Sequence, residues 1–173
     1  TSLNDRIARE KLTLIPDTPP FYDELTAWEH LKFISQLHGI VNWKLRAEAL
    51  LADFDLSAEG DASPNTFSRG MRYKLALCMA FIVKPSLLLL DEPFGPLDPT
   101  AAESLWEMLR QFCTEGGTVL FSSHMLPVDA LPDAFVVIDE GDVITHGSVQ
   151  TVTGVDDVTD WTLNDILWAA LDE

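Results

Sequence analysis

The chain has 173 residues, 47% hydrophobic and 23% charged, a composition typical of one folded globular domain rather than a disordered protein. Its 11 Lys and Arg residues against 28 Asp and Glu residues leave a formal net charge of -17. Because a protein that binds nucleic acid through phosphates needs a basic face, this charge argues against a nucleic-acid partner. The two cysteines are too few for a disulfide framework and indicate a reducing compartment.

The first half of the chain is predicted to be mainly helical. A short strand over residues 11–15 precedes two helices, one capped by Thr26 and one running from an Asn42 cap to about Phe54. Residues 55–65 are polar and predict a loop, and a strongly apolar helix then follows Ser68. The periodicity predicts that these helices bury Leu31, Phe33, Ile34, Leu37, Leu45, Ala49, Leu50, Met71, Leu75, Met79 and Ile82.

The second half alternates strands with helices. Two apolar stretches, Leu87–Leu90 and residues 118–122, predict buried strands, and the helix between them starts at Asp98-Pro99 and ends near Thr114. A short helix near residues 128–131, a hairpin that turns at residues 140–141 and a last helix from Thr162 are expected to follow. This alternation predicts an α/β fold with a largely parallel sheet and an inserted helical part.

Two adjacent carboxylates, Asp91 and Glu92, follow the first of these buried strands. The carboxyl ends of parallel strands are where α/β sheets bind ligands. Asp91 is therefore a candidate Mg²⁺ ligand, and Glu92 a candidate base for an attacking water. His124 follows the next strand and could hydrogen-bond a terminal phosphate at the same edge. The plainer alternative is two solvated acids beside a structural histidine.

A short basic block interrupts the acidic chain. Residues 66–90 contain four basic residues and no acid, and the block opens on Phe67-Ser-Arg-Gly-Met71. A capping hydroxyl and a glycine at a helix N-terminus form a candidate anion site, with an ordinary capped helix as the equally weighted alternative.

In order and spacing, these motifs resemble the ATP-binding cassette (ABC) ATPases. Phe67–Met71 resembles the signature motif, Leu87–Pro93 the Walker B strand, Gly95–Asp98 the D-loop and His124 the switch histidine. The segment Leu14–Thr26 resembles the Q-loop region. The resemblance extends over nearly the whole chain and is closest to cassettes that pair with export-type membrane subunits.

The resemblance implies a P-loop NTPase-like fold, with ATP and Mg²⁺ as substrate and cofactor. Glu92 and His124 would be catalytic, and Asp91 with Asp17 would bind Mg²⁺. Two cassettes would meet head to tail, with ATP held across their interface by a set of residues in the signature motif and D-loop. That set is Ser68, Arg69, Gly70, Met71 and Asp98.

The chain departs from the family pattern in three of its motifs. Arg69 and Met71 replace a glycine and a glutamine of the usual signature, and Asp17 occupies the position of the Q-loop glutamine. Gly95-Pro96 should make the D-loop stiffer. An Asp17 carboxylate could still bind Mg²⁺ but would couple differently to a membrane partner.

The 173 residues contain no G-x-x-x-x-G-K-[ST] sequence, the P-loop that binds phosphates in this family. In the family this loop precedes the Q-loop, so the chain is expected to be a cassette without its N-terminal part and to bind ATP poorly. We expect a helical signature subdomain over about residues 20–85, an α/β core over about 86–147 and a C-terminal extension with a helix over 148–173.

The resemblance thus predicts the ATPase subunit of a membrane exporter, peripheral on the inner face of the cell membrane. Transmembrane subunits would dock around Phe21, Tyr22 and Trp28. The alternative is a non-catalytic regulatory cassette that docks on a partner protein. A soluble cassette of DNA repair or translation is disfavoured because no coiled-coil or nucleic-acid-binding insertion is visible.

Overall fold

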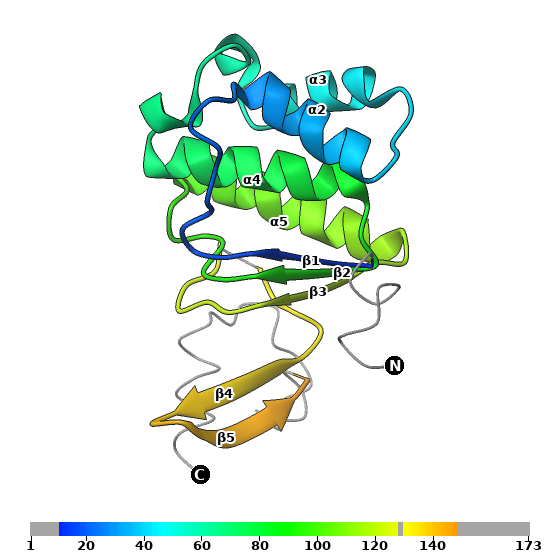
Figure 1. The fold of residues 1–173 in the computed structure, drawn as a ribbon. Coiled ribbons are helices and arrows are strands. Elements are labelled where there is room, and N and C mark those ends of the chain that lie inside the picture. The colour runs from blue at the N-terminus through cyan, green and yellow to red at the C-terminus, as the bar shows by residue number, and fades with distance from the viewer. Residues whose placement is uncertain (1–10, 128–129, 149–173) are drawn as a thin grey trace. The chain divides into compact units, whose positions relative to one another are not determined.

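The structure is a computed structural model, and it describes residues 11–127 and 130–148. The described residues form five strands, four α-helices and two short 3₁₀ helices, labelled in Figure 1. In chain order they are β1 (Leu12–Ile15), α2 (Ala27–Leu37), α3 (Trp43–Asp53), η1 (Ser57–Glu59), η2 (Pro64–Thr66), α4 (Arg69–Val83), β2 (Leu87–Leu90), α5 (Pro99–Thr114), β3 (Thr118–Phe121), β4 (Phe135–Asp139) and β5 (Asp142–Gly147). The chain divides into two compact units, Thr1–His124 and Met125–Glu173.

The first unit contains a three-stranded parallel sheet in the order β1-β2-β3. The central strand β2 pairs with β1 from Leu87 opposite Leu12 and with β3 from Leu87 opposite Thr118. Figure 1 shows α4 and α5 in one layer over this sheet, and α2 and α3 in a further layer over α4. The predicted α/β class with a parallel sheet is confirmed.

Three helix starts follow the local signals in the sequence. Thr26 caps α2 in a capping box, in which its side chain accepts from the Glu29 N–H and the Glu29 carboxylate accepts from the Thr26 N–H. Ser68 caps α4 and Asp98 caps α5, each accepting a backbone N–H in the first turn. Asn42 precedes α3 in a left-handed conformation (φ 57°) and makes no side-chain cap, so that predicted cap is wrong.

The core of the first unit lies between the helices and the sheet. Its largest fully buried side chains are His30, Leu31, Leu51, Phe54, Leu56, Tyr73, Leu75, Leu77, Ile82, Leu88 and Leu105. Several predicted inward positions are instead on the surface, among them Phe33, Leu37 and Leu45, which are 42%, 68% and 77% exposed. The predicted loop over residues 55–65 includes η1 and the start of η2.

The strand β3 is less buried than predicted. It forms an edge of the three-stranded sheet, and its Leu120 is 64% exposed. Along β3, Thr118 and Leu120 are exposed while Val119 and Phe121 are half-buried, so the exposure follows one face of the strand, which a run of apolar residues cannot reveal. The hydrophobicity of residues 118–121 therefore predicted the strand correctly and its burial wrongly.

The second unit contains the predicted hairpin. The strands β4 and β5 are antiparallel and form a sheet of their own, with Glu140 and Gly141 at positive φ in the turn. The expected helix near residues 128–131 falls partly outside the described residues, and Ala130 and Leu131 are not helical. The helix expected from Thr162 also lies outside the described residues. No helix in the described part of the chain is long and apolar enough to span a membrane.

Candidate nucleotide-hydrolysis site

The two acidic residues lie where the central strand ends. The Asp91 N–H continues the sheet pairing by donating to the Ile15 carbonyl (3.0 Å), and the chain then turns sharply at Glu92. Glu92 has a φ of 46°, in the left-handed region that a residue with a side chain seldom adopts. Strained backbone of this kind persists only where neighbouring groups hold it, and it concentrates at functional sites.

The Ser122 hydroxyl holds this turn. It donates to Asp91 Oδ1 (2.8 Å) and accepts from the Glu92 N–H (3.0 Å), so a single oxygen contacts both acidic residues. Its own backbone N–H donates to the Leu90 carbonyl (3.0 Å), which places Ser122 directly beside the end of β2. Ser122 was not among the predicted site residues, although its position at the end of the strand next to β2 was a usable signal.

His124 lies against Glu92. The His124 Nδ1–H donates to Glu92 Oε2 at 2.8 Å, and the His124 backbone N–H lies 3.4 Å from the same oxygen. The imidazole is 69% exposed and the Glu92 side chain 33% exposed, so solvent and a ligand can reach both groups. The structure thus brings Asp91, Glu92 and His124 together at one edge of the sheet.

Tyr73 supports the same edge from inside the protein. Its side chain is fully buried on α4, and its hydroxyl donates to the Asp91 carbonyl (3.3 Å). Burial raises the pKa of the Tyr73 phenol, and the nearby negative charges of Asp91, Asp17 and Glu92 raise it further. The phenol therefore stays neutral and keeps its proton for this hydrogen bond.

The predicted signature residues surround the first turn of α4. Ser68 Oγ accepts from the Met71 N–H (3.2 Å), Met71 is half-buried, and Arg69 Nη2 lies 2.5 Å from Asp17 Oδ1. Gly70 lies against the loop between β2 and α5, where a Cβ would come within 2.7 Å of the Pro96 carbonyl oxygen. The signature turn therefore contacts both the Q-loop segment and the D-loop.

Asp98 connects the D-loop to α4 and α5. Its Oδ1 accepts from the Ala101 N–H (3.0 Å), and its Oδ2 lies 3.7 Å from the Lys74 ammonium. The hydrogen bond from Ala101 lowers the pKa of the Asp98 carboxyl, with a further lowering by Lys74. Its position at a capped helix start is as predicted, and its contact with ATP stays a prediction.

The predicted metal ligands differ in their surroundings. Asp91 is exposed and offers carboxylate oxygen beside a hydroxyl, the donors that Mg²⁺ prefers, whereas the Asp17 carboxylate is paired with Arg69. Among the described residues no group of three or more His, Cys, Asp or Glu side chains is arranged to hold a metal. Asp91 fits Mg²⁺ that arrives with phosphate oxygens, since one or two carboxylates suffice for such an ion.

The three aromatic residues predicted to meet a membrane subunit differ in exposure. Tyr22 is 57% exposed, whereas Phe21 is half-buried between His30 and Arg72. Trp28 is half-buried, with its ring 5.9 Å from that of Trp43 and its indole against Gly60. Trp28 therefore packs within the helical layer.

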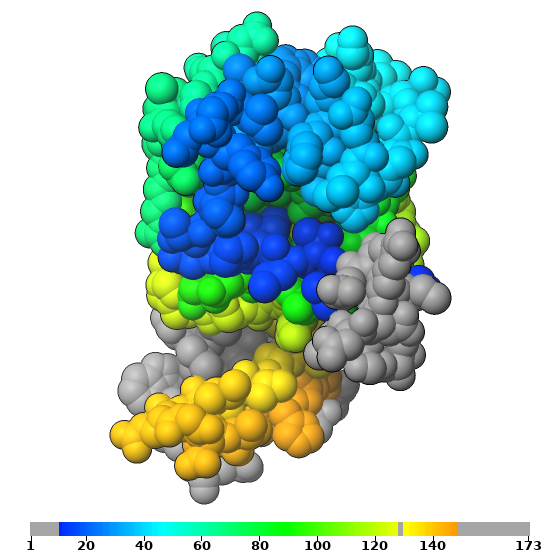
Figure 2. All heavy atoms as spheres, in the orientation of Figure 1, coloured from blue at the N-terminus to red at the C-terminus, as the bar shows by residue number. Residues whose placement is uncertain are grey.

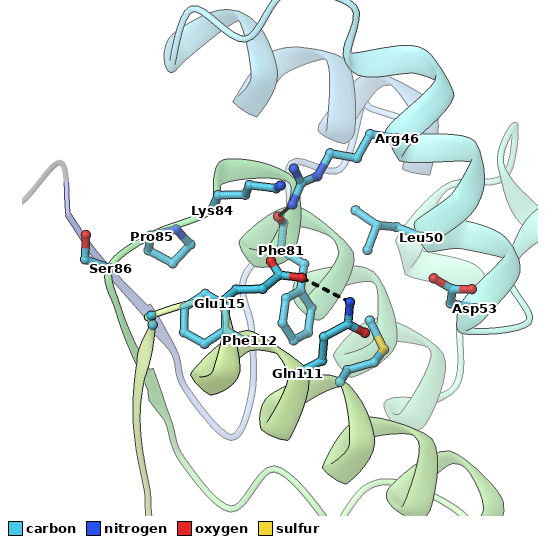
Figure 3. Close-up of a pocket in the computed structure, with 13 residues that line it drawn as sticks. Arg46, Leu50, Asp53, Phe81, Lys84, Pro85, Ser86, Gln111, Phe112 and Glu115 are labelled. Carbon is cyan, nitrogen blue, oxygen red and sulfur yellow. Dashed lines mark hydrogen bonds between the residues drawn. The ribbon is translucent and has the colours of Figure 1, made fainter.

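A pocket of about 500 Å³ opens at the other ends of the strands (Figure 3). Arg46 reaches into it and donates to the Phe81 carbonyl (2.5 Å), and burial lowers the pKa of this guanidinium. The pocket is lined by Arg46, Leu50, Asp53, Phe81, Lys84, Pro85, Ser86, Met108, Gln111, Phe112, Glu115, Gly116 and Gly117. It includes none of the predicted site residues, because those follow the carboxyl ends of β2 and β3.

The family of the chain is shown by its similarity to known proteins. The sequence model of the family described as "ABC transporter" matches residues 1–95. The Bacillus subtilis protein named "Uncharacterized ABC transporter ATP-binding protein YthP" is 40% identical over 141 residues, which are 80% of this chain and 60% of that protein. The "ABC-type transporter ATP-binding protein EcsA" of the same organism is 32% identical over 161 residues, 91% of this chain and 65% of that protein.

A solved structure of an ABC transporter subunit has a similar fold. The protein described as "Structure of ATP binding subunit of ABC transporter" superposes with a TM-score of 0.81 at 28% identity, covering 94% of this chain and 69% of that one. The chain therefore belongs to the ABC transporter family and has its P-loop NTPase-like α/β fold. It spans about 60% to 65% of the length of the two curated relatives.

Proposed function

We propose that this chain is part of the ATP-binding and ATP-hydrolysing subunit of a membrane ABC transporter, of the exporting kind. The observation that carries the proposal is the 2.8 Å contact between Glu92 and His124, beside Asp91 at the carboxyl edge of a parallel sheet. A solvent-accessible base, an imidazole and a carboxylate suited to Mg²⁺ are the groups that phosphoryl transfer to water requires.

In this proposal Glu92, His124 and Asp91 act on different parts of the reaction. Glu92 accepts a proton from the water that attacks the terminal phosphorus of ATP, while the bond to the bridging oxygen breaks and ADP leaves. His124 orients the Glu92 carboxylate through Nδ1–H, and with both ring nitrogens protonated its Nε2–H would donate to a terminal phosphate oxygen. Asp91 would hold Mg²⁺, which would neutralise charge on the phosphate oxygens.

The remaining predicted residues would act at the interface with a second cassette. Ser68, Arg69, Gly70 and Met71 would close over a nucleotide held by that cassette, with Asp98 along the interface. The contact between Gly70 and Pro96 supports this assignment, because it joins the two motifs into one surface. The helical signature subdomain predicted over about residues 20–85 would contain α2, α3 and α4.

A transmembrane subunit would dock around Tyr22, with the chain peripheral on the inner face of the cell membrane. The exposure of the Tyr22 ring supports this surface, and the packing of Trp28 within the helical layer favours Tyr22 over Trp28 as the contact. Phe21 would support this surface through His30, since Phe21 meets the imidazole edge to face and Tyr22 stacks on it.

The decisive test is Glu92→Gln in a polypeptide that joins this chain to a P-loop segment. Because the amide cannot accept the proton, we expect the rate of ATP turnover to fall by about 100-fold or more. Glu107→Gln, an exposed glutamate on α5, is the matched control and should keep the parental rate. Turnover that survives Glu92→Gln would refute the catalytic assignment.

A second candidate function is a non-catalytic regulatory cassette that docks on a partner protein. Calorimetry with the 173-residue chain should then show no saturable ATP binding at sub-millimolar nucleotide. Both candidates predict this result for the chain itself. Restored turnover in the P-loop-joined polypeptide supports the first candidate, and its failure supports the second.

A further inference from the structure

Two of the departures from the family pattern contact each other. Asp17 stands where the family has glutamine and Arg69 where the signature has glycine, and Arg69 Nη2 lies 2.5 Å from Asp17 Oδ1. The two residues are 52 positions apart in the sequence. A glutamine and a glycine at these places could not form an ion pair, so the two replacements together create a contact that neither makes alone.

A second arginine of the same helix reinforces this contact. Arg72 follows Arg69 by three residues and so shares its face of α4. Its Nη2 lies 3.5 Å from the Pro19 carbonyl oxygen, and its guanidinium carbon lies 5.3 Å from the centre of the Phe21 ring. Figures 1 and 2 show the segment that leads from β1 to α2 passing the N-terminal end of α4 along the surface.

The buried His30 of α2 holds the other end of this segment. Its Nδ1–H donates to the Thr26 carbonyl (2.8 Å), which leaves Nε2 to accept from the Tyr22 N–H (3.0 Å). The Phe21 ring meets the imidazole edge to face at 5.3 Å. Residues 17–22, the Asp17–Tyr22 segment, are therefore bonded to α4 at one end and to α2 at the other.

The Asp17–Arg69 pair is exposed, and exposed ion pairs add little to the stability of a fold. Its consequence is positional, because it joins the Asp17–Tyr22 segment to the turn that carries Ser68 and Gly70. We propose that Asp17 and Arg69 are positioning residues that make the signature turn and the Asp17–Tyr22 segment move together, so that Asp17 serves this link rather than a metal. The link between the two segments does not depend on the proposed function. Only the docking of a transmembrane subunit at Tyr22, which the link would couple to the signature turn, rests on that function.

Two backbone amides report on the link without any activity measurement. The Tyr22 N–H is bonded to His30 in the segment, and the Met71 N–H is bonded to Ser68 in the signature turn. Nuclear magnetic resonance of the 173-residue chain gives the exchange rate of each. We expect Asp17→Asn to raise exchange of the Met71 amide, and Arg69→Gln that of the Tyr22 amide, by about two- to five-fold each.

The matched control is Asp23→Asn, since the Asp23 carboxylate accepts from Asn65 rather than from α4. It should leave the Met71 amide unchanged. The charge-swapped double variant, Asp17→Arg with Arg69→Asp, should restore both amides toward their original rates. If each single substitution alters only the amides of its own segment, the proposed link is wrong.

A measurement on the unaltered chain covers the case in which a variant does not fold. Salt at about 1 M screens exposed ion pairs and should accelerate exchange of the Tyr22 and Met71 amides together. If the Tyr22 and Met71 amides do not respond together to salt, the proposed link is wrong. Failure of the proposed function is seen separately, as ATP turnover that survives Glu92→Gln while the two amides still respond as expected.

A Mg²⁺ titration tests separately whether Asp17 is a metal ligand. In the P-loop-joined polypeptide, Asp91→Asn should raise the Mg²⁺ concentration needed for half-maximal turnover, whereas Asp17→Asn should not. If Asp17→Asn raises this Mg²⁺ concentration as much as Asp91→Asn does, Asp17 is a metal ligand. Its assignment as a positioning residue is then wrong.

Discussion

The carbonyl oxygen of Pro96 lies 2.7 Å from the position that a Cβ on Gly70 would occupy. Side chains essentially never approach a backbone oxygen so closely, and glycine at position 70 is what allows this contact. The first turn of α4 and the loop between β2 and α5 therefore meet backbone to backbone. This contact fixes the signature turn relative to the D-loop, 26 residues further along the chain.

Gly70→Ala should separate these two segments. The added methyl group must push either the helix or the loop away, and we expect a loss of about 1–3 kcal/mol in the free energy of unfolding. Urea unfolding of the 173-residue chain, followed by circular dichroism, measures it. Gly95→Ala is the matched control, because its Cβ would meet the Glu92 carbonyl oxygen at 3.6 Å, an ordinary contact distance. Equal stability of the two variants would contradict the close approach.

The sequence predicted features that depend on a few neighbouring residues. Thr26 with Glu29, Ser68, and Asp98 with Pro99 are local start signals, and all three helices begin where these signals stand. The turn at Glu140-Gly141 was predictable for the same reason. The parallel sheet followed from the alternation of strands and helices, since short connections leave few other arrangements.

Burial was less predictable because it depends on which elements meet. Phe33 and Leu37 follow helical spacing on α2 and were expected inside, yet α2 buries Ala27, His30, Leu31 and Ser35. The apolar content of a helix does not specify which stripe faces its neighbours when several stripes contain apolar residues. His30 lies inside because Thr26 and Tyr22 satisfy both of its ring nitrogens.

The contacts of the candidate site were the least predictable. Asp91, Glu92 and His124 were expected at one sheet edge, but the bridging position of Ser122 and the pairing of Asp17 with Arg69 join segments 31 and 52 residues apart. No local pattern encodes which of two distant charged residues will meet. The two departures from the family pattern were visible in the sequence, and their contact became evident only in three dimensions.

The two cysteines should differ sharply in reactivity. Cys78 is buried on α4, and burial raises the pKa of its thiol, whereas Cys113 is exposed on α5. Since the thiolate is the reactive form, we expect one thiol per chain to react with an aromatic disulfide reagent under native conditions and both to react in denaturant. Peptide mapping should assign the native reaction to Cys113. Labelling of Cys78 in the folded chain would contradict its burial.

The capping box of α2 should make stability depend on pH. The hydrogen bond from the Thr26 N–H lowers the pKa of the Glu29 carboxyl below its ordinary value of 4.5, with a smaller lowering from the Thr26 side chain. A carboxyl whose pKa is lower in the folded than in the unfolded chain stabilises the fold above the unfolded value. That stabilisation is lost as the pH falls through the folded value.

Glu29→Ala should therefore lower Tm most at neutral pH, and the difference from the parent chain should shrink as the pH falls below about 4.5. Thermal unfolding at a series of pH values measures this difference. Glu48→Ala, an exposed glutamate on α3 without a capping bond, should show a smaller pH-dependent difference. A Glu29→Ala difference that stays constant down to acidic pH would argue against the charged capping bond.

Ser122 is expected to matter for catalysis because one hydroxyl contacts both acidic residues. Ser122→Ala removes the acceptor of the Glu92 N–H and the donor to Asp91, so the left-handed turn at Glu92 loses its support. In the P-loop-joined polypeptide we expect the rate of ATP turnover to fall by about ten-fold, mainly because the charged hydrogen bond to Asp91 is lost. Ser122→Thr keeps the hydroxyl and should recover most of the rate.

Ser104→Ala is the matched control, since its hydroxyl donates to the Thr100 carbonyl within α5, away from the acidic residues. The chain with Ser104→Ala should keep the parental turnover. Exchange of the Glu92 amide, measured on the 173-residue chain, separates positioning from general stability: Ser122→Ala should accelerate it, while Ser104→Ala should not. If the Glu92 amide of the unaltered chain already exchanges as fast as an amide in open solvent, the bridging role of Ser122 is wrong.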